Sequence, residues 1–149
     1  MEPPTPGRVT VDFDDLSPAK RYFFMISAIV PRPIAWVTSQ DLSGTVNLAP
    51  FSFFQGVCAN PPTLMVAISR QKKSGEGKDS LRHIRETGEF VVNLVTEEVW
   101  DAMLISSLEF PAGTSELQEL GLETFPADEI GPPCVAVSPV NLECRLAEQ

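Results

Sequence analysis

The sequence contains few of the residues on which metal centres and nucleophilic triads depend. Its 149 residues include one histidine, His83, and three cysteines, Cys58, Cys134 and Cys144. A single histidine excludes a multi-histidine metal site, and the wide cysteine spacing excludes a Cys-x-x-Cys motif or a disulfide framework. We therefore expect reduced thiols packed as small hydrophobic side chains, no metal and no catalytic side chain. A redox role then requires a borrowed cofactor.

Basic residues and long apolar runs are also scarce. Lysine and arginine number 11 against 20 acidic residues, and the resulting net charge of −9 would repel a nucleic-acid backbone. No apolar run approaches the roughly 18 residues that span a bilayer, and the first 20 residues lack the basic start and apolar core of a signal peptide. These observations predict a soluble cytoplasmic protein that binds neither nucleic acid nor membranes.

Glycine is outnumbered by proline, with nine glycines and 14 prolines. Proline breaks helices, so this composition disfavours a bundle of long helices and favours short strands joined by tight turns. The length suits one domain. Four prolines and four acidic residues fall within residues 1–18, which we expect to form an extended arm, with a single domain over residues 19–149.

Strand, turn and helix signals alternate along the predicted domain. Residues 22–30 form an apolar run that fits either a buried strand or a short helix. Beyond it, the pattern predicts strands at 34–38, 45–54, 63–69 and 89–95, short helices at 81–87, from Thr96 and from Ser115, and extended pieces at 134–137 and 140–144. This order predicts an antiparallel sheet with helices at its ends, of the α+β or barrel class. No Gly-x-Gly-x-x-Gly motif follows any predicted strand.

Three local features refine this outline. The segment 63–69 is apolar enough to be a central strand of the sheet. We expect Asp79 or Ser80 to cap the helix at 81–87, and Gly88 to end it. We also expect Ser115 and its neighbours to form a capping box for the last helix.

The first candidate site is the segment 47–54, Asn-Leu-Ala-Pro-Phe-Ser-Phe-Phe. Ala49 and Pro50 let another group approach the backbone, while Asn47 and Ser52 offer hydrogen bonds beside three phenylalanines. This mixture suits a flat heteroaromatic ligand. The alternative is a core strand with an incidental polar face.

The second candidate site combines Ser69 and Arg70, at the end of a strand, with Lys78, Asp79 and Ser80, at the start of a helix. Helix amino termini bind anions through backbone N–H groups, and basic and hydroxyl side chains can add contacts to a phosphate. The alternative is a solvated charged loop. Together, the two candidate sites have the outline of a mononucleotide site.

Trp36, Trp100 and His83 have simpler interpretations. Tryptophan is more often a core or interface residue than a cofactor contact, although Trp36 lies in the hairpin that faces Asn47. We expect His83 at the surface or at the edge of its helix.

Five motifs occur in order along the chain, namely PRPIAWVTS (31–39), G-x-x-NLAPFSFF (44–54), NPP (60–62), KDSLRHIRETGEFVVN (78–93) and a terminal Glu-Cys pair (143–144). Together they resemble the flavin reductase-like, FMN-binding split-barrel family, which includes flavoredoxins and the reductase components of two-component monooxygenases. The resemblance covers about residues 20–145. It implies a split β-barrel of Greek-key type, with antiparallel strands and short peripheral helices. It also implies a homodimer that holds FMN near the subunit interface.

The resemblance assigns the FMN ring to the first candidate segment and the strand before it, and the phosphate to the second candidate. The residues so assigned are Trp36, Thr38, Ser39, Asn47, Leu48, Ala49, Pro50, Ser52, Ser69, Arg70, Lys78, Asp79 and Ser80. Members of the family usually continue with further strands beyond the Glu-Cys pair. This chain is therefore either a shortened member of the family or closes its barrel differently, and in both cases the resemblance does not assign the pyridine-nucleotide contacts of that region.

The function implied by the resemblance is that of an NAD(P)H-dependent flavin reductase. NAD(P)H would give a hydride to FMN, and the electrons would pass to free flavin, a monooxygenase or another acceptor. Such a transfer needs alignment and shielding more than an acid or base, which agrees with the missing triad. The alternative is a flavoredoxin-like FMN-binding electron carrier without significant NAD(P)H turnover.

Overall fold

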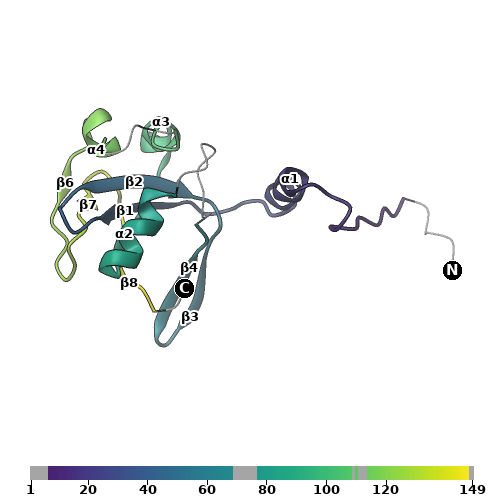
Figure 1. The fold of residues 1–149 in the computed structure, drawn as a ribbon, viewed down its shortest axis with the longest axis horizontal. Coiled ribbons are helices and arrows are strands. Elements are labelled where there is room, and N and C mark those ends of the chain that lie inside the picture. The colour runs from purple at the N-terminus through teal and green to yellow at the C-terminus, as the bar shows by residue number, and fades with distance from the viewer. Residues whose placement is uncertain (1–6, 69–76, 109, 111–113, 148–149) are drawn as a thin grey trace. The chain divides into compact units, whose positions relative to one another are not determined.

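A computed structural model describes residues 7–68, 77–108, 110 and 114–147 of the chain (Figure 1). The chain divides into two units, Met1–Arg32 and Pro33–Gln149. We expected the boundary after residue 18, whereas the two units meet after Arg32. The difference arises because residue 18 begins a helix that belongs to the first unit.

The first unit contains helix α1 (Pro18–Ala28). The Ser17 side chain accepts a hydrogen bond from the Lys20 backbone N–H, and proline in the first turn lacks an N–H that would otherwise be unpaired. The apolar run at 22–30 is therefore mostly helical, which decides between the two alternatives. No residue of α1 is buried. With the preceding segment, α1 forms a shallow apolar groove lined by Val11, Leu16, Lys20, Phe23, Phe24, Ser27 and Ala28.

The second unit consists mainly of antiparallel strands. Its central sheet has the order β2-β1-β5-β8, while β3 pairs with β4 and β6 with β7 in two-stranded ribbons. The strands are β1 (Ala35–Gln40), β2 (Val46–Phe51), β3 (Phe54–Ala59), β4 (Pro62–Val66), β5 (Glu89–Leu94), β6 (Thr124–Phe125), β7 (Cys134–Val135) and β8 (Asn141–Arg145). The helices are α2 (Asp79–Thr87), the 3-10 helix η1 (Glu97–Val99), α3 (Trp100–Ile105) and α4 (Glu116–Glu119). The predicted class, an antiparallel sheet with short helices, is confirmed.

The two faces of the central sheet carry separate hydrophobic cores. On one side, which we call the α2 face, Val37 of β1 packs with Ile84 of α2. On the other side, the α3–α4 face, Trp36 packs with Met103 of α3 and Leu117 of α4. Figure 1 shows α2 on one side of β1 and β2, with α3 and α4 on the other. Because side chains alternate along a strand, adjacent residues of β1 serve different cores.

Asn93 of β5 is the centre of a polar network on the α3–α4 face. Its buried amide donates to the Trp36 carbonyl at 2.8 Å and to Thr38 Oγ1 at 3.3 Å. Its amide oxygen accepts from the Val135 N–H at 2.9 Å and from Asn141 Nδ2 at 2.7 Å. The network ties β1, β5, β7 and β8 together and uses the hydrogen-bonding capacity of the Asn93 amide.

Two strand predictions were wrong in part. β4, predicted as a central strand at 63–69, pairs with β3 in a ribbon apart from the central sheet and is mostly exposed. An apolar run does not reveal whether a second strand lies on its other side. The predicted strand 45–54 is divided, because β2 ends at Phe51 and β3 begins at Phe54.

The helix predictions were nearly right in their bounds and partly wrong in their caps. The N-cap of α2 is Lys78, and Gly88 ends the helix in the left-handed conformation, with φ 74°. The Ser115 side chain makes no capping hydrogen bond to α4. Within the described part of the chain, no helix is long and apolar enough to cross a bilayer.

The cysteines are free thiols in three different environments. Cys134 is buried, Cys144 is half-buried and Cys58 is exposed, so the expectation of buried thiols is wrong for Cys58. Burial raises the pKa of Cys144 to about 11, which keeps this thiol protonated at neutral pH.

Candidate functional site

The Lys78 side chain places a positive charge at the start of α2. Lys78 occupies the N-cap position, and its ammonium lies 5.4 Å from the centre of the Phe51 ring, to whose face it is attracted. Phe51 itself is buried in the core. An ammonium cannot accept hydrogen bonds, so Lys78 offers no side-chain cap to the N–H groups of the first helical turn. The charge of Lys78 and the helix dipole together favour an anion at this end of α2.

Asn47 links β2 to the first turn of α2. Its amide lies 2.8 Å from the Ser80 hydroxyl and 3.2 Å from the Glu116 carboxylate. Because an ionised carboxylate only accepts, we assign the Asn47 NH₂ to Glu116 and the amide oxygen to the Ser80 hydroxyl. All three residues are buried. The two candidate sites of the sequence therefore meet at the contact between Asn47 and Ser80.

Glu116 of α4 closes the outer edge of β2. Its Oε2 accepts a hydrogen bond from the Leu48 backbone N–H at 3.0 Å, and only 7% of Glu116 is exposed. Because this N–H is bonded to a side chain, the backbone polar groups of Leu48 point away from β1. Those of Pro50, two residues further along β2, point in the same direction. Proline has no N–H, so it leaves no unpaired donor at this strand edge.

His83 lies at the centre of the polar contacts between α2 and β1. It is only 1% exposed, so the prediction of a surface or helix-edge position was wrong. Its Nδ1 lies 3.4 Å from Ser39 Oγ, and its Nε2 lies 3.1 Å from Arg82 Nη2. Burial lowers the pKa of His83 below 6.5, and the Arg82 charge adds to this effect, while a hydrogen bond to the Ser39 backbone and the charges of Asp41 and Asp79 oppose it.

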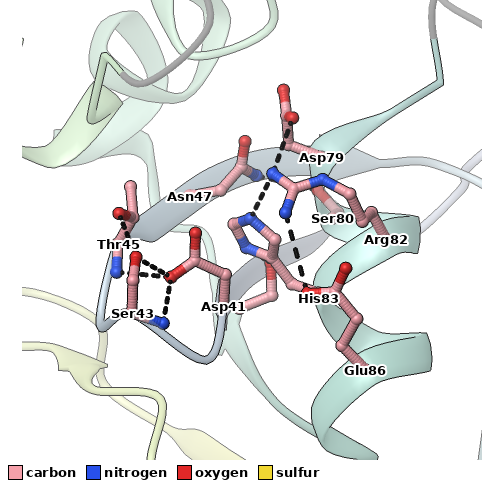
Figure 2. Close-up of polar contacts among 10 residues, drawn as sticks. Asp41, Ser43, Thr45, Asn47, Asp79, Ser80, Arg82, His83 and Glu86 are labelled. Atoms are coloured by element: carbon pink, nitrogen blue, oxygen red, sulfur yellow. Dashed lines mark hydrogen bonds and ion pairs between the residues drawn. The ribbon is translucent and has the colours of Figure 1, made fainter.

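Arg82 covers His83 from the solvent side. Figure 2 shows its guanidinium above the imidazole ring, between Asp79 and Glu86 of the same helix. The distances are 3.2 Å to Asp79 Oδ1 and 3.7 Å to Glu86 Oε2. These ion pairs fix the guanidinium against His83, and half of the Arg82 side chain remains exposed.

The other residues predicted for the ring divide between the two faces of the sheet. Trp36, Thr38 and Leu48 are fully buried on the α3–α4 face. The Trp36 indole donates to Ser106 Oγ at 2.9 Å, and the Thr38 hydroxyl donates to the Pro133 carbonyl at 2.6 Å. On the α2 face, Ser39 contacts His83 and Asn47 contacts Ser80. The remaining predicted ring contacts, all half-buried, are Ala49, Pro50 and Ser52.

Two of the residues predicted for the phosphate, Ser69 and Arg70, lie outside the described residues. The other three, Lys78, Asp79 and Ser80, are gathered at the start of α2.

Sequence reasoning overlooked Arg82 and Glu116, which shape this region, and placed His83 wrongly at the surface. A signal for His83 was present. Ser80, His83 and Ile84 follow the i, i+3, i+4 spacing of one helix face, and all three are buried. For Glu116 no local signal existed, because its partner, the edge of β2, lies far away in the sequence.

Comparison with known proteins places this chain in a family. A family model described as a flavin reductase like domain matches residues 26–149. The chain belongs to the flavin reductase-like family. An uncharacterised family relative from Halalkalibacterium halodurans is 40% identical over 133 residues, which cover 89% of this chain. The chain spans about 63% of the length of that relative.

Solved structures agree with the family assignment. Component B of nitrilotriacetate monooxygenase from Bacillus cereus is 33% identical with a TM-score of 0.88, over 97% of this chain and 70% of that one. A protein with a split barrel domain from Shewanella frigidimarina is 22% identical with a TM-score of 0.78, over 91% and 65% of the two chains. The second similarity, which concerns the fold alone, confirms the split barrel predicted from the flavin reductase-like motifs.

Proposed function

We propose that this flavin reductase-like chain binds FMN on the α2 face, with the phosphate at the start of α2. The observation that carries the proposal is the contact between Asn47 and Ser80 beside the Lys78 cation. A flavin phosphate carries nearly two negative charges, which a chain of net charge −9 repels unless the local field is reversed. Lys78 and the N–H groups of α2 supply a positive field at this point. The residues present therefore fit the anionic end of FMN.

The proposed phosphate set keeps all five residues predicted from the sequence, Ser69, Arg70, Lys78, Asp79 and Ser80. Within it, the roles differ. The Ser80 hydroxyl is committed to Asn47 as a donor, so we assign its contribution to the phosphate to the backbone N–H. Asp79 holds Arg82 by an ion pair, which keeps a second cation near the helix start.

We propose that the flavin ring lies along the outer edge of β2, beyond the contact with Glu116. The proposed ring contacts are the half-buried residues Ala49, Pro50 and Ser52, with the buried Ser39 and Asn47 next to them. A small side chain at Ala49 and the missing N–H of Pro50 suit the approach of a flat ring to the backbone. Because the side chains of Trp36, Thr38 and Leu48 face the other core, we propose that they support these strands from behind.

We further propose that the protein is an NAD(P)H-dependent flavin reductase. Bound FMN would accept a hydride from NAD(P)H and pass electrons to free flavin, a monooxygenase or another acceptor. The similarity to component B of nitrilotriacetate monooxygenase supports a monooxygenase as partner. The chain's own residues would bind and orient the flavin, with Lys78 at the anionic end and the strand edge along the ring.

Absorption spectroscopy and stopped-flow mixing test this function. Protein purified with FMN should show the visible absorption of a flavin, and NADH or NADPH should bleach it rapidly. Retained FMN without bleaching would instead support the flavoredoxin-like electron carrier. Failure to bind FMN at all would contradict both functions.

We also propose that the protein forms a homodimer. Helix α1 carries Tyr22, Phe23, Phe24 and Met25 but has no buried residue, which suits a helix that packs on a second subunit. An obligate interface of this kind would bury more than about 2,000 Å². Analytical ultracentrifugation at micromolar concentration should give the mass of a dimer, and a monomer would contradict the proposal.

A further inference from the structure

The contacts of His83 determine which of its ring nitrogens carries the proton. Arg82 Nη2 lies 3.1 Å from Nε2, and a guanidinium can only donate. Nε2 therefore accepts, and the single proton of the neutral ring belongs on Nδ1, which faces Ser39 of β1. In this form, the imidazole donates from Nδ1 to Ser39 of β1 and accepts at Nε2 from Arg82 of its own helix.

A second proton on His83 would go onto Nε2 and would leave the Nδ1 contact with Ser39 in place. It would place an N–H against the Arg82 donor and a charge in a site that is 1% exposed. The charged groups around the ring are Asp41 from the β1–β2 hairpin and Asp79, Arg82 and Glu86 from α2 itself. Asp41 and Asp79 favour the imidazolium, but burial and Arg82 outweigh them, and the pKa of His83 is lowered.

His83 also connects the two ends of the proposed flavin site. In α2 it follows Ser80 by three residues, which places both on one face of the helix. In the sheet, its partner Ser39 is paired directly with Asn47 of β2. Two contacts therefore join this face of α2 to neighbouring positions of β1 and β2, His83 with Ser39 and Ser80 with Asn47. Figure 2 labels His83 and Ser80 on the helix and Asn47 on the strand that faces it.

We propose that neutral His83 is a positioning residue, which holds the start of α2 against β1 and Asn47 and so makes flavin affinity sensitive to acid. This inference rests on the proposed function of flavin binding. When His83 is protonated, the buried charge and the new N–H beside Arg82 make the packed position of α2 on β1 less stable. Positions of α2 further from β1 then gain population, and in them the phosphate and ring contacts no longer fit one ligand. Acid therefore weakens FMN binding by way of the helix, without any contact between His83 and FMN.

Nuclear magnetic resonance can test this coupling directly, because His83 is the chain's only histidine. On tag-free protein, a pH titration of the imidazole signals should show the Nδ1–H tautomer at neutral pH. The same titration with saturating FMN should give a lower pKa for His83, since linkage is reciprocal. A decrease of about half a unit corresponds to about a threefold loss of FMN affinity on protonation. An unchanged pKa in the FMN complex would overturn the inference and leave flavin binding intact.

Matched variants give an independent test. His83→Gln and His83→Asn keep one amide donor and one acceptor but cannot be protonated, so at least one of them should bind FMN about as well as the wild type at pH 8. The FMN phosphate also titrates near neutral pH, but the ratio of wild-type to variant dissociation constants cancels that effect. This ratio should rise about threefold or more as the pH falls from 8 to 5. A constant ratio with intact folding by circular dichroism would overturn the coupling. Absence of FMN binding at pH 8 in the wild type would overturn the proposed function as well.

Discussion

Both faces of the central sheet bury polar side chains, but they satisfy them in different ways. On the α3–α4 face, Asn93 is saturated by groups of the chain itself, from the Trp36 carbonyl to Asn141. On the α2 face, the contact between Asn47 and Ser80 lies in the first turn of a helix whose N-cap is the cation Lys78. A network made only of neutral groups stabilises the fold, whereas one at a positively charged helix start can also attract an anionic ligand.

This difference assigns separate roles to side chains that are neighbours in the sequence. Thr38 and Ser39 follow one another in β1, yet Thr38 bonds to the Pro133 carbonyl on one face and Ser39 contacts His83 on the other. We therefore expect substitutions on the α3–α4 face to change stability and those on the α2 face to change flavin affinity. The predictions below test this separation.

The largest effect should follow from Asn93→Ala. The substitution removes all four side-chain hydrogen bonds of the amide and leaves the buried Val135 N–H without its acceptor. We expect the free energy of unfolding in urea to fall by about 3 kcal/mol or more. Asn141→Ala, which removes a single partner of Asn93, should cost less. The FMN affinity of the folded fraction should stay unchanged. A loss of FMN affinity without a loss of stability would contradict the assignment of separate roles to the two faces.

Lys78→Ala should have the next largest effect, on FMN binding rather than on stability. Loss of a charge-assisted hydrogen bond to the phosphate should weaken FMN binding by about 1.5 to 3 kcal/mol. Riboflavin lacks the phosphate, so its binding should hardly change. Arg85→Ala is the matched control, because it removes a cation from the last turn of the same helix. Equal losses for FMN and riboflavin in a fluorescence titration would show that Lys78 supports the fold instead.

Glu116, at the edge of β2, should affect both stability and flavin affinity. Glu116→Ala removes the acceptor for the Leu48 N–H and the partner of Asn47, so we expect a loss of about 1 to 2 kcal/mol in unfolding free energy and weaker FMN binding. Glu116→Gln retains an acceptor for Leu48 and should recover most of the stability. Urea unfolding and FMN titration measure the two effects. A loss of stability with unchanged FMN affinity would place Glu116 with the structural network.

Much of the fold was predictable because its signals are local. The hairpin of β1 and β2, the bounds of α2 and its end at Gly88 follow from alternation, turn residues and glycine conformation. The ribbon of β3 and β4 was not, because an apolar run carries no information about which strands lie beside it.

Within the candidate site, the residue types were predictable from the sequence. The prediction did not, however, consider which face of the sheet each side chain occupies. Period-two alternation already separates Trp36 and Thr38 from Ser39. The burial of His83 and Glu116 depends on partners 44 and 68 residues away, Ser39 and Leu48. Such distant contacts are set by the packing of α2 and α4 on the sheet and leave only a weak trace in the local pattern.

The smallest expected effect is the change of stability with pH. The Asn93 network contains only groups that do not titrate, so it should not contribute to this change. At the other side of the sheet, Asp41 closes the β1–β2 hairpin by accepting hydrogen bonds from the Ser43 hydroxyl and from the backbone N–H groups of Ser43 and Thr45. The Ser43 hydroxyl contributes most to lowering the pKa of Asp41 from 3.8 to about 2. A carboxyl whose pKa is lower in the folded state contributes stability that is complete above pH 3.8 and is lost as the pH falls toward 2.

Comparison of wild type with Asp41→Asn in urea, from pH 8 to pH 2, isolates this contribution. The wild type should be the more stable protein above pH 4, and the difference should shrink through the Asp41 window and be mostly lost near pH 2. His83 acts in a separate window. The pKa of His83 is lowered from 6.5, so its contribution to stability is complete above pH 6.5 and is lost as the pH falls below that value. His83→Gln should abolish this loss of stability, whereas Asp41→Asn should retain it. A stability difference between wild type and Asp41→Asn that stays constant down to pH 2 would mean that the Asp41 charge does not hold the hairpin.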